Sequence, residues 1–176
     1  MAATPSMSRT GASRINMDSR CQFLGHWPSR DGLALLDLAK VLVLGLDYLK
    51  GAYYAGTPCS TTHLVYMVAK GSVRVEGPDG ARVLSAGSML VAPAGQPHWV
   101  RSGARGAAVA AWFHLCDEEG WAHLRGRPFE IAPCPRAAES AALLERFFRE
   151  WNSGELEARA VCQDLAEILL VDLRRA

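Results

Sequence analysis

The sequence lacks an excess of either charge. Its 19 lysines and arginines oppose 18 aspartates and glutamates, so the formal net charge is +1. A nearly neutral chain has no electrostatic reason to bind nucleic acid or an anionic membrane by itself. We therefore expect this chain to bind neither DNA nor a membrane surface directly.

Long apolar runs, paired cysteines and phosphate-binding loops are also missing. The longest apolar stretch, residues 33–49, is interrupted by charged residues and a glycine, and the N-terminus has no apolar signal segment. The five cysteines never form a Cys-x-x-Cys pair, which indicates reduced thiols rather than a disulfide framework or a zinc site. No glycine-rich segment leads into a helix. We expect a cytoplasmic globular protein without a membrane span.

What the sequence does contain is a long series of short apolar runs. At 176 residues the chain can form one well-packed domain. Residues 1–20 are small and polar, which predicts a disordered or loosely docked arm. From residue 33 to residue 115, apolar or alternating runs are separated by turn residues, which is typical of an antiparallel sandwich or barrel. Residues 69–72 and 77–80 are predicted to be tight hairpin turns.

The periodicity becomes helical after residue 134. Large apolar residues recur on one stripe up to Trp151, and Gly154 is a suitable left-handed C-cap. A second helix is predicted from residue 155 to residue 174, with an apolar face too wide for one contact. We expect its residues Leu170, Val171 and Leu173 to form a dimer interface, unless the whole face packs within one monomer. The chain thus divides into an arm (1–20), a barrel (21–134) and a helix pair (135–176).

One motif inside the strand region is distinctive. Gly87, Pro93, Gly95 and His98 stand six, two and three residues apart. Proline and glycine suit a tight turn here, with Gly95 at positive φ, so the segment predicts a hairpin that directs His98 into a sheet. These four positions resemble the second motif of the cupin superfamily, although Ser102 stands where that motif usually has asparagine.

The cupin resemblance raises the question of a metal. It implies a first motif with two histidines and a glutamate, which join the second-motif histidine around the ion. Here the corresponding positions hold Thr57, Cys59 and Leu64, or in another alignment Pro58, Ser60 and Leu64. A divalent transition metal generally needs three or four N, O or S donors. We therefore expect no metal and no other cofactor.

The sequence gives equally little support for a catalytic site that works without a metal. The predicted strands carry only Asp37, Asp47 and Glu76 as acids, and no close acid pair is evident inside the barrel. A nucleophilic pair of Cys59 and His98 stays open, since such pairs are identified by geometry. We assign no catalytic residue.

The strand pattern suggests a pocket instead. If His98 points into the barrel, Leu64 and Tyr66 face the interior with it on a neighbouring strand. On residues 107–115, Trp112 and His114 share the face that better suits a pocket, although alternation does not decide which face points inward. We expect Leu64, Tyr66, His98, Trp112 and His114 to bind a small organic effector. The alternative is that they fill the barrel as core.

Residues 63–77, the motif around His98, and Ala-Trp-Phe-His-Leu at 111–115 together resemble the N-terminal domain of AraC-type transcription regulators. That resemblance implies a mainly β, cupin-like jelly-roll barrel (a double-stranded β-helix) followed by two α-helices. It also implies effector binding, a homodimer, and DNA binding through a helix-turn-helix domain that this chain does not contain. We therefore expect the chain to be the ligand-sensing and dimerisation domain of a bacterial transcription regulator. It is either an excised sensor domain or a natural single-domain protein.

Two other functions stay open. One is a small stand-alone cupin isomerase, epimerase or lyase that uses His98 without a metal. The other is an interaction module whose barrel is filled.

Overall fold

The computed structural model describes residues 21–23, 40–102, 106–118 and 120–175. The predicted arm at 1–20 lies outside this part of the chain. Within it, nine strands precede two α-helices, and a short 3-10 helix, Ala122–Leu124, lies before the last strand. The strands and helices are β1 (Cys21–Phe23), β2 (Val41–Lys50), β3 (Tyr53–Thr57), β4 (Thr62–Gly77), β5 (Gly80–Ser85), β6 (Ser88–Ala92), β7 (His98–Ser102), β8 (Ala107–Cys116), β9 (Glu130–Pro133), α2 (Ala137–Ser153) and α3 (Ala158–Arg175).

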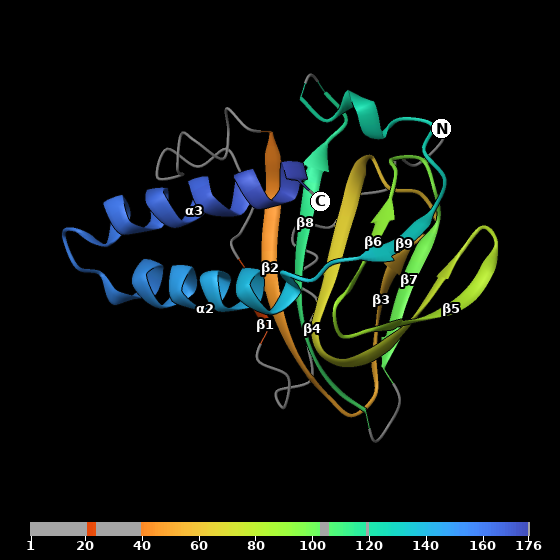
Figure 1. Cartoon of the computed structure of the whole chain (residues 1–176), viewed down its shortest axis with the longest axis horizontal. Coiled ribbons are helices and arrows are strands. Elements are labelled where there is room, and N and C mark those ends of the chain that lie inside the picture. The colour runs from red at the N-terminus through yellow and green to blue at the C-terminus, as the bar shows by residue number, and fades with distance from the viewer. Residues whose placement is uncertain (1–20, 24–39, 103–105, 119, 176) are drawn as a thin grey trace, which may run out of the picture.

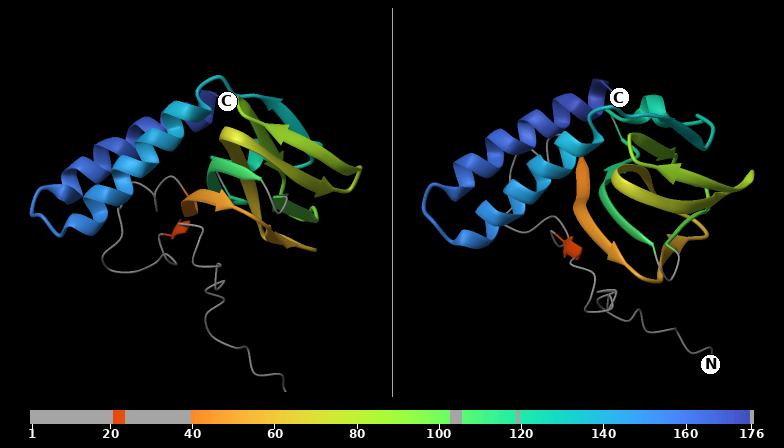
Figure 2. Two further views of the ribbon diagram at one scale, coloured as in Figure 1. Left: turned by 90° about the horizontal axis from the view of Figure 1, so that it is seen from below. Right: turned by 60° about the horizontal axis from the view of Figure 1, so that its bottom comes forward.

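The strands form two antiparallel sheets that share the long strand β4. The helix-covered sheet has the order β1-β2-β8-β4-β6-β9, and the open sheet has the order β5-β4-β7-β3. Figures 1 and 2 show both helices on one side of the barrel and the β4–β5 hairpin on the other. The mainly β barrel followed by two C-terminal helices is the fold that the sequence predicts.

The course of β4 differs from the prediction. A hairpin at 69–72 was expected, but β4 continues through these residues and a bulge lies between Val68 and Lys70. Gly71 has φ 75°, and a Cβ at this position would collide with the carbonyl oxygen of Ala107. The glycine therefore serves a bulge that bends β4 from one sheet into the other, rather than a turn. The predicted hairpin at 77–80 is confirmed, because Gly77 pairs with Gly80.

The segment that carries His98 is a corner between sheets, not a hairpin. β6 pairs with β4 and β9, whereas β7 pairs with β3 and β4. Gly95 has the predicted positive φ, 84°, and its N–H donates to the carbonyl of Ser60 over 2.7 Å. The turn thus carries the chain from the helix-covered sheet to the open sheet, and His98 is buried as β7 begins.

The alternation of side chains separates two apolar cores. On β4 and β8, Val65, Met67 and Phe113 belong to the core between the sheet and the helices. Tyr66 and Ala110 belong to the core inside the barrel. Because neighbouring residues of a strand point to opposite faces, β4 and β8 contact both the barrel interior and the helix pair.

The helix pair closes the outer face of the helix-covered sheet. α2 packs on β2, β4 and β8, and it ends at Gly154 in the left-handed conformation, as predicted. An ion pair of 2.5 Å between Arg136 and the buried Asp172 joins the start of α2 to the end of α3. Among the described residues, no helix has both the length and the apolar character needed to cross a membrane.

The division of α3 between core and surface differs from the expected one. Leu170 and Leu173 are buried in the core that α3 forms with α2 and the sheet. Val171 is 38% exposed and Ile168, three residues earlier, is 45% exposed. The prediction that Leu170 and Leu173 form a dimer surface is therefore wrong, because these side chains are already buried within the chain.

Candidate functional site

The barrel interior brings the five predicted binding residues to one region. On the paired strands β4 and β8, Leu64 lies opposite His114 and Tyr66 lies opposite Trp112. Leu64 and Tyr66 belong to the interior core, and Trp112 packs against it. The face of β8 that carries Trp112 and His114 is therefore the inward one.

The two histidines lie close enough to influence each other electrostatically. Burial of the His114 imidazole, and then the charge of a protonated His98, lower the pKa of His114 to about 4. Burial also lowers the pKa of His98, against a raising effect of its hydrogen bond to Gln96. Both rings are therefore neutral at pH 7, so each has one nitrogen that donates and one that accepts.

Hydrogen bonds fix which nitrogen accepts. The Ser60 hydroxyl donates to the Thr62 carbonyl over 2.7 Å, so the Thr62 hydroxyl donates to the Ser60 oxygen over 3.1 Å. The Nδ1–H of His114 then donates to the Thr62 hydroxyl over 2.8 Å, and Nδ1–H of His98 donates to the Gln96 carbonyl over 3.3 Å. Each ring keeps Nε2 as an acceptor, and an acceptor pair suits a ligand with hydroxyl or N–H groups.

The Trp112 indole fits against β2 because the residue opposite it on that strand has no side chain. Gly45 is the partner of Trp112 across the β2–β8 pair, and a Cβ on Gly45 would collide with the indole ring. The same indole meets the His114 ring edge to face, with 5.6 Å between the ring centroids. Trp112 and His114 are partly exposed although they face inward, so this end of the interior is in contact with solvent.

We expect Gly45→Ala to destabilise the protein by about 1 to 3 kcal/mol, because the added methyl group overpacks the contact with the indole. In a Trp112→Ala background the same change should cost much less, since the colliding ring is gone. Urea unfolding of the four proteins in this double-mutant cycle measures the difference. An equal cost of Gly45→Ala in both backgrounds would contradict the packing described here.

The interior also contains an acid that the sequence analysis did not place there. Asp47 is only 1% exposed, and the Tyr66 hydroxyl donates to its carboxylate over 3.5 Å. Asp47 is a single carboxylate, so it does not contradict the expectation that the interior has no close acid pair. Asp47 lies two residues from both Gly45 and Leu49 on β2, and these two face the interior. Because residues two apart on a strand share a face, the sequence alone could have predicted that Asp47 points inward.

The donors at the cupin metal positions do not fit a divalent metal. Thr57 is partly buried opposite His98, Cys59 is exposed in the following loop, and Leu64 is apolar core. Among the described residues, no three His, Cys, Asp or Glu side chains come together in a way that could hold an ion. Exposed Cys59 and buried His98 also make a poor nucleophilic pair.

His63 is buried on the opposite face of β4 from Leu64. Its Nδ1 accepts from the Ala94 N–H over 3.0 Å, and Nε2–H donates to Asp117 over 3.0 Å. Asp117 also accepts from Arg125 over 2.6 Å, and this bond is the main reason why its pKa is lowered. His63 thus fastens the turn before β7, which positions His98 without contacting the interior.

Comparison with known proteins identifies a family. The model of the AraC-like ligand binding domain matches residues 53–173, more than half of the chain. Among curated proteins, none matches the sequence significantly.

Solved structures similar to this chain have low identity. A protein of unknown function from Rhizobium leguminosarum is 15% identical, with a TM-score of 0.42, over 59% of this chain and 86% of that one. KdgF from Halomonas sp. is 16% identical, with a TM-score of 0.42, over 57% and 82%. A Bacillus subtilis oxalate decarboxylase variant is 18% identical, with a TM-score of 0.40, over 56% and 26%. At these scores the likenesses carry no argument about function.

Proposed function

The chain belongs to the family of AraC-like ligand-binding domains, and we propose that its cupin-like barrel binds a small organic effector at the end lined by Trp112 and His114. The observation that carries this proposal is the pair of neutral imidazoles, His98 and His114, with Nε2 acceptors beside a partly exposed indole. The indole offers an apolar face and the imidazoles accept hydrogen bonds. An uncharged, hydroxyl-bearing ligand with a flat or apolar face suits this combination.

The strands of the site suggest how binding would be transmitted. Tyr66 and Trp112 face the interior, while the next residues, Met67 and Phe113, pack toward the helices. A ligand that binds one arrangement of β4 and β8 more tightly would shift the population of helix-pair arrangements. In the proposed regulator, this shift would alter how DNA-binding domains outside this chain are placed.

A homodimer is part of the proposal. Of the three residues first expected at its interface, Leu170 and Leu173 are core, and Val171 stays available together with Ile168. These two lie one helical turn apart on the exposed side of α3. Sedimentation velocity that finds only monomer at every concentration would contradict this part.

The binding proposal is tested by thermal shift and calorimetry with panels of sugars, small phenols and organic acids. A ligand of the site should raise the melting temperature. Its affinity should fall about tenfold or more in Trp112→Ala and in His114→Asn, since each loses a ring that contacts it. Leu156→Ala, at a 97% exposed position between the two helices, is the control and should bind as the parent does. Unchanged affinity in both site variants would exclude this location.

A stand-alone enzyme stays a second candidate because of Asp47. A buried carboxylate and an imidazole in one barrel could serve as acid and base. Incubation of the stabilising ligand with the protein, followed by mass spectrometry and NMR, distinguishes the candidates. Recovery of unchanged ligand supports a sensor, and conversion that is lost in Asp47→Asn supports an enzyme.

A further inference from the structure

The outer face of the open sheet carries a row of four exposed side chains. Val83, Arg74, Arg101 and Tyr54 lie directly opposite one another on β5, β4, β7 and β3. Their side chains point away from the barrel, because the alternate residues of these strands fill its interior. This row lies on the opposite wall from the helix pair and outside the ligand site proposed above (Figures 1 and 2).

The two arginines of the row are held but not neutralised. Arg101 Nη2 is 3.1 Å from one Glu76 oxygen, and Arg74 Nε is 3.5 Å from the other. The Arg101 guanidinium also lies 4.7 Å above the centre of the Tyr54 ring. The cluster of two arginines and one glutamate has a charge of +1, and each guanidinium has five N–H donors. Glu76 uses few of them, so the cluster can bind an added anion.

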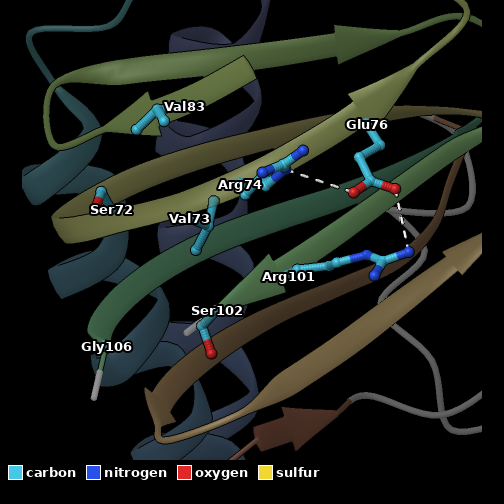
Figure 3. Close-up of a pocket in the computed structure, with 8 residues that line it drawn as sticks. All are labelled: Ser72, Val73, Arg74, Glu76, Val83, Arg101, Ser102 and Gly106. Carbon is cyan, nitrogen blue, oxygen red and sulfur yellow. Dashed lines mark ion pairs between the residues drawn. The ribbon is translucent and has the colours of Figure 1, made fainter. Parts of the chain in front are cut away.

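The surface beside this cluster is concave. A groove of about 580 Å³ lies where β4 and β7 separate beyond the Arg74–Arg101 pair, as Figure 3 shows. This volume is within the range of small-molecule sites. The groove is lined by Ser72, Val73, Arg74, Glu76, Val83, Arg101, Ser102 and Gly106.

We propose that this groove binds a small organic carboxylate. The planar fork of an arginine matches the two oxygens of a carboxylate, and Arg74 and Arg101 lie side by side on adjacent strands. Val83 is 65% exposed and lines the groove, so the apolar part of the ligand has a surface to cover. The Ser72 hydroxyl adds a donor at the rim. The ligand takes the place of Glu76 on one or both guanidinium groups.

The probe is hexanoate, titrated into the full chain and followed by NMR of backbone amides and arginine Nε–H groups. We expect saturable shifts at Arg74, Glu76 and Arg101. Hexan-1-ol has no carboxylate and inorganic phosphate has no apolar part, so each should bind about tenfold more weakly. Absence of saturable binding would overturn the proposal. So would hexanoate shifts confined to Trp112 and His114, or phosphate that binds as tightly as hexanoate.

Charge variants separate this site from general attraction of anions. Arg74→Gln and Arg101→Gln should each weaken hexanoate binding about tenfold, because each removes a charge-assisted hydrogen bond. Arg82→Gln removes the same charge from β5, where Arg82 is paired with Asp79 outside the groove, and should leave the affinity unchanged. Glu76→Gln should strengthen binding severalfold, since it removes the competing carboxylate. Equal weakening by Arg82→Gln, or weaker binding in Glu76→Gln, would overturn the proposal.

Discussion

Replacement of Phe147 by alanine is expected to lower the free energy of unfolding by about 3 to 5 kcal/mol. Phe147 is fully buried in the core between α2, α3 and the helix-covered sheet. Its ring stacks on Trp151 at 6.1 Å and meets Phe148 edge to face at 5.6 Å. The Cys162 thiol also donates to the Phe147 carbonyl, so α3 packs around the cavity that the truncation leaves. Equilibrium unfolding in urea measures the loss.

The matched control for this prediction is Leu156→Ala. Leu156 lies between the two helices and is 97% exposed, so its truncation should change stability by no more than about 0.5 kcal/mol. A cost below about 1 kcal/mol for Phe147→Ala would mean that the helix pair does not share a core with the barrel. That result would also remove the route by which an interior ligand is proposed to influence the helices.

Strand positions could be predicted from the sequence more reliably than strand partners. Of the apolar or alternating runs expected between residues 33 and 115, the one at 41–49 corresponds to β2, and those at 63–69 and 73–76 both lie in β4. The alternation of a strand is local, whereas the role of Gly71 is not, because a turn and a bulge both use a glycine at positive φ. Only the long-range pairing decides between them, because β4 pairs with β6 before the bulge and with β5 and β7 after it.

The short strands β3 and β9 were not predicted at all. Their sequences, Tyr-Tyr-Ala-Gly-Thr and Glu-Ile-Ala-Pro, contain glycine or proline and have no clear alternation. β3 pairs with β7 and β9 pairs with β6, along their whole length or nearly so. Such strands are determined by a partner that is distant in the sequence, and local propensity does not reveal them.

Parity along strands was the more useful signal for the site. It grouped Leu64 with Tyr66 and Trp112 with His114 but left open which face of residues 107–115 points inward. The pairing of β4 with β8 decides this and brings the four together, although their role in binding stays a prediction. The same parity places Asp47 inside with Gly45, a position that the sequence analysis did not assign. Helical periodicity was less informative at Leu170, because it defines a stripe without showing what covers it.

The interior histidines should make the protein sensitive to acid. In the unfolded chain His114 binds a proton with a pKa of 6.5, but in the folded chain only with a pKa of about 4. Between these values the unfolded state binds more protons, so stability falls as the pH falls. The contribution is complete above pH 6.5 and is lost by about pH 4. Its size is on the order of 2 to 3 kcal/mol, since the imidazole is partly exposed.

The decisive measurement is urea unfolding at several values of pH between 7 and 4 for the parent and for His114→Asn. Asparagine cannot take up the proton, and its side-chain amide can still donate to the Thr62 hydroxyl. We therefore expect the parent to lose stability more steeply than the variant as the pH falls. His123→Asn, which removes an exposed imidazole from the 3-10 helix, should follow the parent. Parallel curves for parent and His114→Asn would show that His114 is not desolvated, and an interior site built on its neutral ring would then have no basis.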